Sequence, residues 1–421
     1  MMRDHPYRFL TVVYGITVAC FSVLPIVNCL WGGGNKDYSH WYEAGLLVLQ
    51  GADLYTKDGG GHLVYMYPPT TAVLLAPLSA LGALAVVIPL LLINSAAWLA
   101  SVVLSVYLTT GRAWGQRPML YFVPAAITAP YVGEMFFLGQ PNLMLLTCML
   151  GAFACLRRGH GWGAGALIAF AASIKAFPIA AIVYLVYRGY WKATMATLAC
   201  LFFFLVLLPA PFRGFQRNLD ELWTWTEGMV LRYDDGVVGQ RPDRGYSWKN
   251  QSLLAVANRL LRPANANDDH NDPFWINVAE LDFKAVNAVI VIVSLGLCLF
   301  YLAAMPRQAY RTDRSDAIEH AMLLLLILMF SPLSYIYFFV WLLYPLTVAL
   351  NLCLSAPAPS ARRTAAWTCL GGTLLLLALT LLDFALPREV VQALGNHLWA
   401  CLLLLGWFGW ELRQTEPTLP S

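Results

Sequence analysis

The residues best suited to chemistry in this chain follow its first long apolar run. In the segment DYSHWYEAG, Asp37, His40 and Trp41 are spaced at i, i+3 and i+4, so a helix would present a carboxylate, an imidazole and an indole on one face. Burial makes a carboxylate a stronger base, because it disfavours the charged form. We therefore predict that Asp37 is a general base. The alternative role is an N-cap for a helix over residues 38–50, which Gly51 would end.

A second candidate is a lysine within an apolar run. Lys175, in ASIKAFP, has apolar neighbours and no adjacent acidic residue. An ammonium group in such surroundings is costly, so its presence indicates an anionic partner, and a lipid phosphate would serve. The alternative is a lysine that extends to lipid headgroups.

Neutral polar residues form a third group. Gln140 and Asn142, in FFLGQPNLM, carry donors and acceptors suited to sugar hydroxyls, or they satisfy helix ends across a tight turn. Asn250, Arg259 and Arg262 lie where a long hydrophilic stretch becomes apolar again, and we predict that this segment lines a lipid groove. No set of His, Asp and Glu has the spacing of metal ligands in the sequence. We expect no metal and no other cofactor.

The elements that must position these residues are predicted to be membrane spans. The 421 residues are 59% hydrophobic and 12% charged, and apolar runs of about 20 residues recur along the chain. This pattern is typical of an all-α polytopic membrane protein. The net charge of +3 and the lack of a basic tail give no reason to expect a nucleic-acid partner.

The distribution of Arg and Lys predicts about twelve spans with both termini in the cytoplasm. A break at residues 175–178 is needed to keep Arg188 and Lys192 inside. The polar candidates then all fall on the outer side. The predicted spans cover residues 9–30, 84–108, 119–132, one ending at 156, two short spans within 162–187, 191–209, 285–305, one ending at 330, one ending at about 354, 366–386 and one ending before residue 413.

We interpret residues 1–421 as a single membrane domain with two large outer loops. The first loop, residues 31–82, is expected to contain surface-lying helices and the catalytic segment. The second, residues 212–284, is long and hydrophilic.

With these motifs the chain resembles glycosyltransferase family 87, whose members are polytopic enzymes of the GT-C class. The segments that carry the resemblance are, in chain order, DYSHWYEAG, LQGADLY, YMYPPTTAVLLAPL, LGQPNLML, ASIKAFP, WKNQSLL and SPLSYIYFFVWLLYP. Their joint order is more specific than any one of them.

The resemblance implies a GT-C type helix bundle in the cell (inner) membrane. The implied activity is transfer of a sugar, mannose in the family's best example, from a polyprenyl-phosphate donor to a lipid or glycan hydroxyl at the extracytoplasmic face. We expect a single displacement with inversion. Asp37 would be the family's catalytic aspartate, and the donor phosphate would contact Lys175, Arg259 and Arg262. The predicted substrate-binding residues are His40, Trp41, Glu43, Tyr67, Gln140, Asn142, Asn250, Ser331 and Tyr337.

One segment departs from the family pattern. Members often carry a histidine after the Ser-Pro motif that begins here at Ser331, whereas this chain has Tyr335 and Tyr337 in that region. A tyrosine can donate a hydrogen bond but supplies no positive charge.

Two other classes of protein remain as alternatives. A secondary transporter or lipid flippase would show internal repeats and charges near the bilayer midplane. The sequence has no clear repeat, and its polar residues gather on one predicted side. A non-catalytic subunit of cell-envelope assembly would tolerate the loss of Asp37.

Overall fold

The computed structural model describes residues 5–32, 36–56, 64–235, 237–238, 241–242, 245–267, 272–357, 359–381 and 387–414. Clustering of contacts divides the chain into two compact units. Unit 1 comprises Met1–Leu104 and Ala113–Arg232, and unit 2 comprises Ser105–Arg112 and Tyr233–Ser421. The expectation of a single domain over residues 1–421 stays a prediction, and each unit is described by itself below.

The regular secondary structure in the described residues of unit 1 is helical. Its elements are α1 (His5–Trp31), α2 (Asp37–Leu49), α3 (Pro69–Ser79), α4 (Ala83–Thr110, whose last turns belong to unit 2), α5 (Met119–Leu138), α6 (Asn142–Arg157), α7 (Gly161–Ile174), η1 (Phe177–Ala180), α8 (Ala181–Tyr187), α9 (Trp191–Phe202), η2 (Phe203–Leu207), α10 (Ala210–Arg213), α11 (Phe215–Trp225) and η3 (Thr226–Leu231).

Unit 2 combines helices with one small antiparallel sheet in the part that is described. Its elements are β1 (Val237–Val238), β2 (Arg241–Pro242), α12 (Leu253–Leu261), α13 (Phe283–Ala304), η4 (Gln308–Tyr310), α14 (Asp313–Phe330), η5 (Ile336–Leu342), α15 (Leu343–Ser355), α16 (Ala361–Ala378), η6 (Leu379–Leu381), α17 (Arg388–Ala393) and α18 (Asn396–Arg413).

Six helical segments of the described chain are long and apolar enough to cross a membrane. They are Phe9–Trp31, Ala83–Thr110, Met119–Leu138, Trp191–Arg213, Phe283–Ala304 and Ile336–Ser355. This finding confirms the prediction of a helical membrane protein. The predicted count of about twelve spans stays a prediction, because α6, α7 and the segment Phe177–Tyr187 are apolar but shorter.

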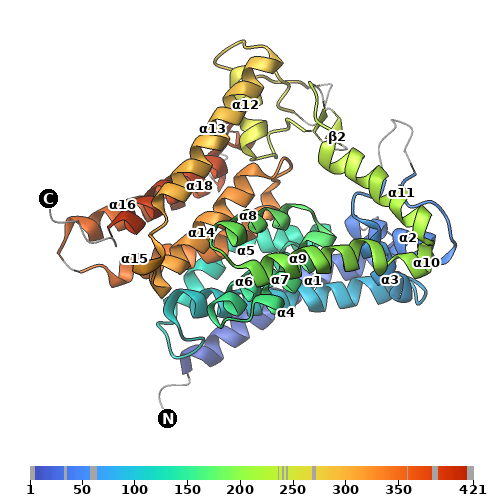
Figure 1. Ribbon diagram of the computed structural model, residues 1–421, viewed down its shortest axis with the longest axis horizontal. Helices are drawn as coiled ribbons and strands as arrows, with labels where there is room; N and C mark the ends of the chain where they lie inside the picture. The colour runs from blue at the N-terminus through green and yellow to red at the C-terminus, as the bar shows by residue number, and fades with distance from the viewer. Residues whose placement is uncertain are drawn as a thin grey trace. The chain divides into compact units, whose positions relative to one another are not determined.

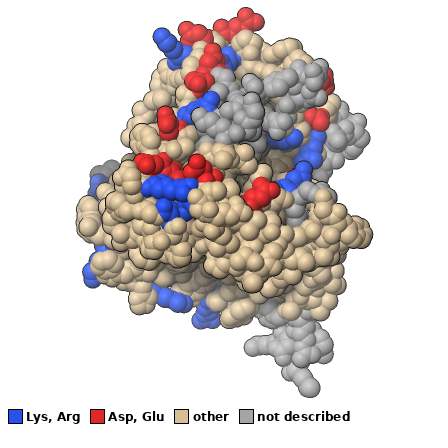
Figure 2. Space-filling view, turned by 90° about the vertical axis from the view of Figure 1, so that its right-hand side faces the viewer, with Lys and Arg blue, Asp and Glu red and all other residues tan. Residues whose placement is uncertain are grey.

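Figure 2 shows where charged side chains lie on one face of the molecule. Lys and Arg lie beside Asp and Glu at several places, and wide areas between them carry neither. An uncharged surface of this kind is suited to contact with lipid.

The first loop folds as two helices that share a core. α2 and α3 lie with α10 and α11 at one end of unit 1, at the right in Figure 1. Gly45 of α2 permits a close approach, since a Cβ there would lie 2.1 Å from Ser79 Oγ of α3. α2 ends at Leu49, and Gly51 follows with φ of 64°, which agrees with the predicted helix end. The core residues are Trp41, Ala44, Val48, Leu54, Tyr65, Tyr67, Ala72, Val73, Leu75, Ala76 and Val86.

The predicted break near Lys175 is present. α7 ends at Ile174, and Lys175 has an extended backbone with φ of −141° and ψ of 133°. The 3₁₀ turn η1 follows, with Pro178 at its start. In a continued α-helix Pro178 would have no backbone N–H to donate to the Ile174 carbonyl, and its ring would clash with that carbonyl, which explains why α7 ends at Ile174.

Glycine allows α7 and α9 to pack backbone to backbone. A Cβ at Gly165 would lie 2.3 Å from the carbonyl oxygen of Ala193 and 2.7 Å from the amide nitrogen of Thr197. A Cβ at Gly163, in the same helix, would meet only Cys155 Sγ at 3.4 Å. The first position is closed to any side chain, and the second is open to a methyl group.

We therefore predict that Gly165→Ala destabilises the protein by about 1–3 kcal/mol through overpacking, while Gly163→Ala changes stability little. Thermal unfolding of the two variants in the same detergent measures the difference. Equal melting temperatures would contradict the close packing of α7 on α9.

Candidate active site

The carboxylate of Asp37 is turned toward neighbouring segments and does not cap its own helix. α2 begins at Asp37, and the N-cap position is Lys36, which makes no side-chain capping bond. The prediction that Asp37 caps this helix is therefore wrong. Asp37 Oδ2 instead accepts hydrogen bonds from the Tyr67 hydroxyl, at 3.0 Å, and from Gln140 Nε2.

The residue before Asp37 has an uncommon backbone conformation. Lys36 has φ of 50°, and among the described residues other than glycine it is the one with positive φ. Such a conformation is strained for a residue with a side chain and persists where the surroundings impose it. Here it allows α2 to start with its first carboxylate directed at Tyr67 and Gln140.

The Tyr67 hydroxyl has one hydrogen to donate. It lies 3.0 Å from Asp37 Oδ2 and 3.2 Å from Gln140 Oε1. The charged carboxylate is the stronger acceptor, so we assign the hydrogen to Asp37. The phenol ring is held by Trp41, because the two ring centres are 3.9 Å apart.

Gln140 also contacts the lysine that the sequence singled out. Lys175 Nζ donates to Gln140 Oε1 at 2.5 Å and to Asn142 Oδ1 at 3.3 Å. The same Nζ lies 5.5 Å from the centre of the Tyr67 ring, within cation–π range. The structure thus brings together residues from distant parts of the sequence. We call this group the polar cluster; its members are Asp37, Tyr67, Gln140, Asn142 and Lys175.

The orientation of the Gln140 amide is determined by its two neighbours. A lysine ammonium only donates hydrogen bonds, and an ionised carboxylate only accepts them. The amide oxygen must therefore face Lys175 and the amide nitrogen must face Asp37, as the structure has them.

The start of α2 is tied to the end of α5. The Tyr38 hydroxyl donates to the Phe136 carbonyl, and Trp41 Nε1 donates to the Gly139 carbonyl, both at 2.9 Å. Gly139 has φ of 80°, and a Cβ there would lie 2.8 Å from the Tyr38 ring. Because Gln140 directly follows Gly139, these contacts fix the distance between Asp37 and Gln140.

The other end of α2 is held by two arginines. Arg213 NH2 donates to the Ala52 carbonyl at 2.7 Å, and its guanidinium forms a buried ion pair with Glu221. Arg217 NH1 donates to the Gly51 carbonyl at 2.7 Å, and its NH2 lies 2.6 Å from Asp53. Positive charge at a helix C-terminus is favourable, so these contacts stabilise α2 from the side opposite Asp37.

Arg213 and Glu221 were not among the site residues predicted from the sequence. Glycine at position 214 separates the short helix α10 from α11, so the spacing of eight residues between the pair did not indicate a contact. The available signal was the presence of these charges at the border of an apolar run. Asn94 was also missed, and its Nδ2 donates to the Gln140 carbonyl at 3.3 Å.

Two predicted substrate-binding residues of α2 lie at its surface. His40 Nδ1 is 4.0 Å from Glu43 Oε2, and these side chains are 42% and 59% exposed. Trp41, predicted to share the face of His40, is buried. The three residues predicted to share one helix face therefore have different surroundings. Asp37 binds Tyr67 and Gln140, and Trp41 packs on the Tyr67 ring. His40 is directed to Glu43.

The described residues of unit 2 place Asn250 and Arg259 in the interior. Asn250 Nδ2 donates to the carbonyls of Gly245 and Pro332, each at 2.8 Å. Arg259 Nε donates to the Ala393 carbonyl at 2.9 Å, and its NH1 and NH2 groups bind the carbonyls of Tyr246, Ser247, Asn250 and Gln392. Burial lowers the pKa of Arg259 to about 9, which leaves the guanidinium cationic at neutral pH.

These contacts give both residues a structural function within unit 2. The Arg259 guanidinium is fully buried and directs its donors to backbone carbonyls. We therefore do not include Arg259 among the residues proposed to bind phosphate. Asn250 joins the turn after α14 to the segment before α12, which again is a structural contact.

The other candidates of unit 2 lie in separate surroundings. Arg262 pairs with Asp235, and its guanidinium carbon lies 4.9 Å from the centre of the Tyr246 ring. Ser331 is buried at the end of α14, where its carbonyl accepts a hydrogen bond from Ser334 Oγ. Tyr337 stacks on Tyr335, with ring centres 6.1 Å apart. No described contact joins these three side chains into one site.

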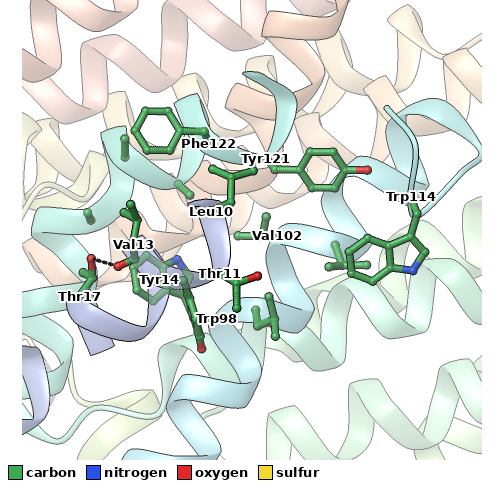
Figure 3. A pocket seen from close by; sticks show the side chains of 15 residues that line it. Leu10, Thr11, Val13, Tyr14, Thr17, Trp98, Val102, Trp114, Tyr121 and Phe122 are labelled. Carbon is green, nitrogen blue, oxygen red and sulfur yellow. Dashed lines mark hydrogen bonds between the residues drawn. The ribbon is translucent and has the colours of Figure 1, made fainter. Parts of the chain in front are cut away.

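A separate apolar pocket lies in unit 1 between α1, α4 and α5. It has a volume of about 450 Å³ and is lined by residues such as Leu10, Tyr14, Trp98 and Phe122 (Figure 3). Its lining comes from the first half of α1, the second half of α4 and mainly the first half of α5, and it includes neither Asp37, Gln140 nor Lys175. The pocket is therefore distinct from the polar cluster, and its lining suits a hydrocarbon chain better than a sugar.

Comparison with known proteins defines the family. Residues 65–332, more than half of the chain, match the model of glycosyltransferase family 87. The chain belongs to this family. The match includes Tyr67, Gln140, Asn142 and Lys175, and Asp37 lies before it.

One relative of this family 87 protein has a named activity. It is the polyprenol-phosphate-mannose-dependent alpha-(1-2)-phosphatidylinositol mannoside mannosyltransferase of Mycolicibacterium smegmatis. The two are 25% identical over 364 residues, which cover 78% of this chain and 74% of the relative. No solved structure matches the chain.

The buried ion pair behind α2 makes a prediction about stability. Glu221→Leu leaves the Arg213 guanidinium buried without its carboxylate, so we expect a loss of about 3–5 kcal/mol. Asp53→Ala removes the carboxylate of an exposed pair, and we expect a loss of no more than about 1 kcal/mol. Chemical unfolding in detergent measures both, and equal losses would contradict the assigned difference between the two pairs.

Proposed function

We propose that this family 87 protein transfers a hexose, with mannose as the first choice, from a polyprenyl phosphate to a hydroxyl group of a lipid or glycan acceptor. The observation that carries the proposal is the binding of Asp37 and Lys175 to the two ends of one Gln140 amide. A base and a cation held within one small cluster are the two groups that this reaction requires. The named activity of the mycolicibacterial relative supports the choice of donor.

In the proposed step, Asp37 acts as the general base. Its Oδ2 accepts hydrogen bonds from Gln140 and Tyr67, while the described residues offer no hydrogen bond to Oδ1. Oδ1 is therefore the atom that takes the proton of the acceptor hydroxyl. The acceptor oxygen then bonds to the anomeric carbon on the face opposite the phosphate, which inverts its configuration.

The leaving group is the polyprenyl phosphate. The bond between the anomeric carbon and the phosphate oxygen breaks as the new glycosidic bond forms, and its electron pair stays on the phosphate. Lys175 lies in the cluster as the cation that would stabilise this charge. Because phosphate is a good leaving group, the step needs less help from a general acid than glycoside hydrolysis does.

The proposed location of this reaction is the extracytoplasmic face of the cell membrane. The distribution of Arg and Lys supports it, because cytoplasmic loops are rich in these residues and the predicted outer loops carry the polar cluster. The apolar helices around the cluster would admit a lipid donor from within the bilayer.

We predict that Asp37→Asn lowers kcat by at least about 100-fold, because the amide keeps the shape of the side chain and cannot accept the proton. The control is Asp53→Asn, a carboxylate of the same loop that is 82% exposed and pairs with Arg217, and we expect normal turnover. Initial rates with purified protein and polyprenyl-phosphate mannose give the comparison. Near-normal turnover of Asp37→Asn would remove this residue from the role of base.

For Lys175 we predict an effect on the donor. Lys175→Met should lower kcat/KM for the polyprenyl-phosphate sugar by roughly 100-fold and change KM for the acceptor little, because the lost charge acts on phosphate. Lys175→Arg keeps the charge and should recover part of the rate. If KM for the acceptor rose instead and the donor parameters stayed constant, Lys175 would belong to the acceptor site.

A further inference from the structure

The two charged groups of the cluster do not contact each other. Lys175 Nζ donates to Gln140 Oε1, and Gln140 Nε2 donates to Asp37 Oδ2, so one amide lies between the ammonium and the carboxylate. The ion pairs among the described residues do not include Asp37 with Lys175. Yet opposite charges attract strongly where water is scarce, and both side chains lie in partly buried surroundings.

A direct ion pair would impair a base. An ammonium in contact with a carboxylate stabilises its ionised form, so the carboxylate holds a proton less well. It would also occupy a lone pair that the acceptor hydroxyl needs. A primary amide avoids both effects, because it is neutral and has a donor and an acceptor on adjacent atoms.

We propose that Gln140 is a positioning residue of the transfer reaction, whose amide keeps the Lys175 ammonium away from the Asp37 carboxylate and leaves Oδ1 for the acceptor. This inference rests on the proposed function, in which Asp37 is the base. From the sequence, Gln140 was predicted to bind sugar hydroxyls or to satisfy helix ends across a tight turn. In the structure both ends of its amide are instead engaged by Asp37 and Lys175, with the Tyr67 hydroxyl 3.2 Å from its oxygen.

The backbone of Gln140 supports this function. It follows Gly139, whose carbonyl binds Trp41 of α2, and its own carbonyl accepts from Asn94 of α4. Gln140 is 5% exposed. Because two helices hold the backbone at positions 139 and 140, the Gln140 side chain cannot easily move out from between Asp37 and Lys175. The packing therefore maintains the separation of the two charges.

Few other charged groups face Asp37 from the described residues. Tyr67, which precedes α3, and Lys175, which acts through Gln140, are the titratable groups of the neighbouring segments. On the side of α2 itself, His40 is directed to Glu43, and Lys36 Nζ lies 5.6 Å from the centre of the Phe137 ring. Changes at position 140 should therefore act on Asp37 through the hydrogen bond from Gln140 Nε2, through the Tyr67 hydroxyl and through Lys175.

The test uses two variants that shift the titration of Asp37 in opposite directions. In Gln140→Met the carboxylate loses the hydrogen bond of a neutral amide, and the ammonium is released to contact it. A full charge has a larger effect than a neutral dipole, so the acid limb of kcat/KM should move to lower pH by about one unit, with a reduced kcat. In Gln140→Glu a second carboxylate contacts Asp37, and two such groups cannot both ionise readily. The acid limb should then move to higher pH by about one unit or more.

A second readout does not depend on turnover. A hydrophobic carbodiimide adds to a protonated carboxyl group, so mass spectrometry of the labelled peptide reports the fraction of protonated Asp37 at each pH. The labelling midpoint should move down in Gln140→Met and up in Gln140→Glu. Adding Lys175→Met to Gln140→Met should reverse the downward shift, because the ammonium is then absent.

The matched control is Gln216→Met, in which an exposed glutamine of α11 that donates to Asp220 is replaced. It should change neither profile. If both Gln140 variants lost activity while the acid limb and the labelling midpoint stayed in place, Gln140 would be a structural residue and the proposal would be overturned.

The same data separate this inference from the function on which it rests. Opposite shifts of the labelling midpoint, in a protein that transfers no sugar from any polyprenyl phosphate, would overturn the function and leave the separation of charges standing. Normal sugar transfer by the unaltered protein, with labelling midpoints that do not move in the Gln140 variants, would support the function and overturn the separation of charges.

Discussion

A carboxylate and an ammonium group within one apolar bundle attract each other, and the neutral side chain of Gln140 keeps them apart. Its oxygen binds Lys175 and its nitrogen binds Asp37, and neither neighbour can exchange its role as donor or acceptor. The packing of unit 1 must bring three distant segments together for this arrangement to form. They are the start of α2, the turn after α5 and the break after α7. The helix break at Lys175, the left-handed Gly139 and the strained Lys36 each place one of the three side chains.

The helix that carries Asp37 is fixed at both ends. Tyr38 and Trp41 attach its start to the end of α5, and Arg213 and Arg217 bind the carbonyls that follow its last turn. α3 covers its apolar face. The two hydrogen bonds at the start of α2 are buried, and buried hydrogen-bonding groups are costly to leave unpaired, so these contacts hold α2 in position as well as stabilise it. This short helix thus has the rigidity that the proposed role of Asp37 as a general base requires.

Unit 2 shows how the same residue types can have a structural function. A fully buried arginine and a buried asparagine bind the backbone carbonyls around the turn after α14, in segments where the sequence suggested contacts with lipid phosphate and sugar. Polar side chains in an apolar protein have two uses, substrate binding and satisfaction of irregular backbone. The sequence does not separate them, because both require donors and acceptors in apolar surroundings.

The sequence by itself determined the class of the protein. Runs of apolar residues predicted a helical membrane protein, and Gly51 predicted the end of α2. The charges of Arg188 and Lys192, together with Pro178, predicted the break at residues 175–178. These features are local, because helix length, glycine and proline act on the residues next to them. It also indicated Asp37, Gln140 and Lys175 as candidates, from polar types in apolar segments. Only the tertiary structure decided that these residues meet, that Asp37 does not cap its helix, and that Arg259 is directed to backbone carbonyls. Those outcomes depend on which distant segments pack together, and no local pattern in the sequence contains that information.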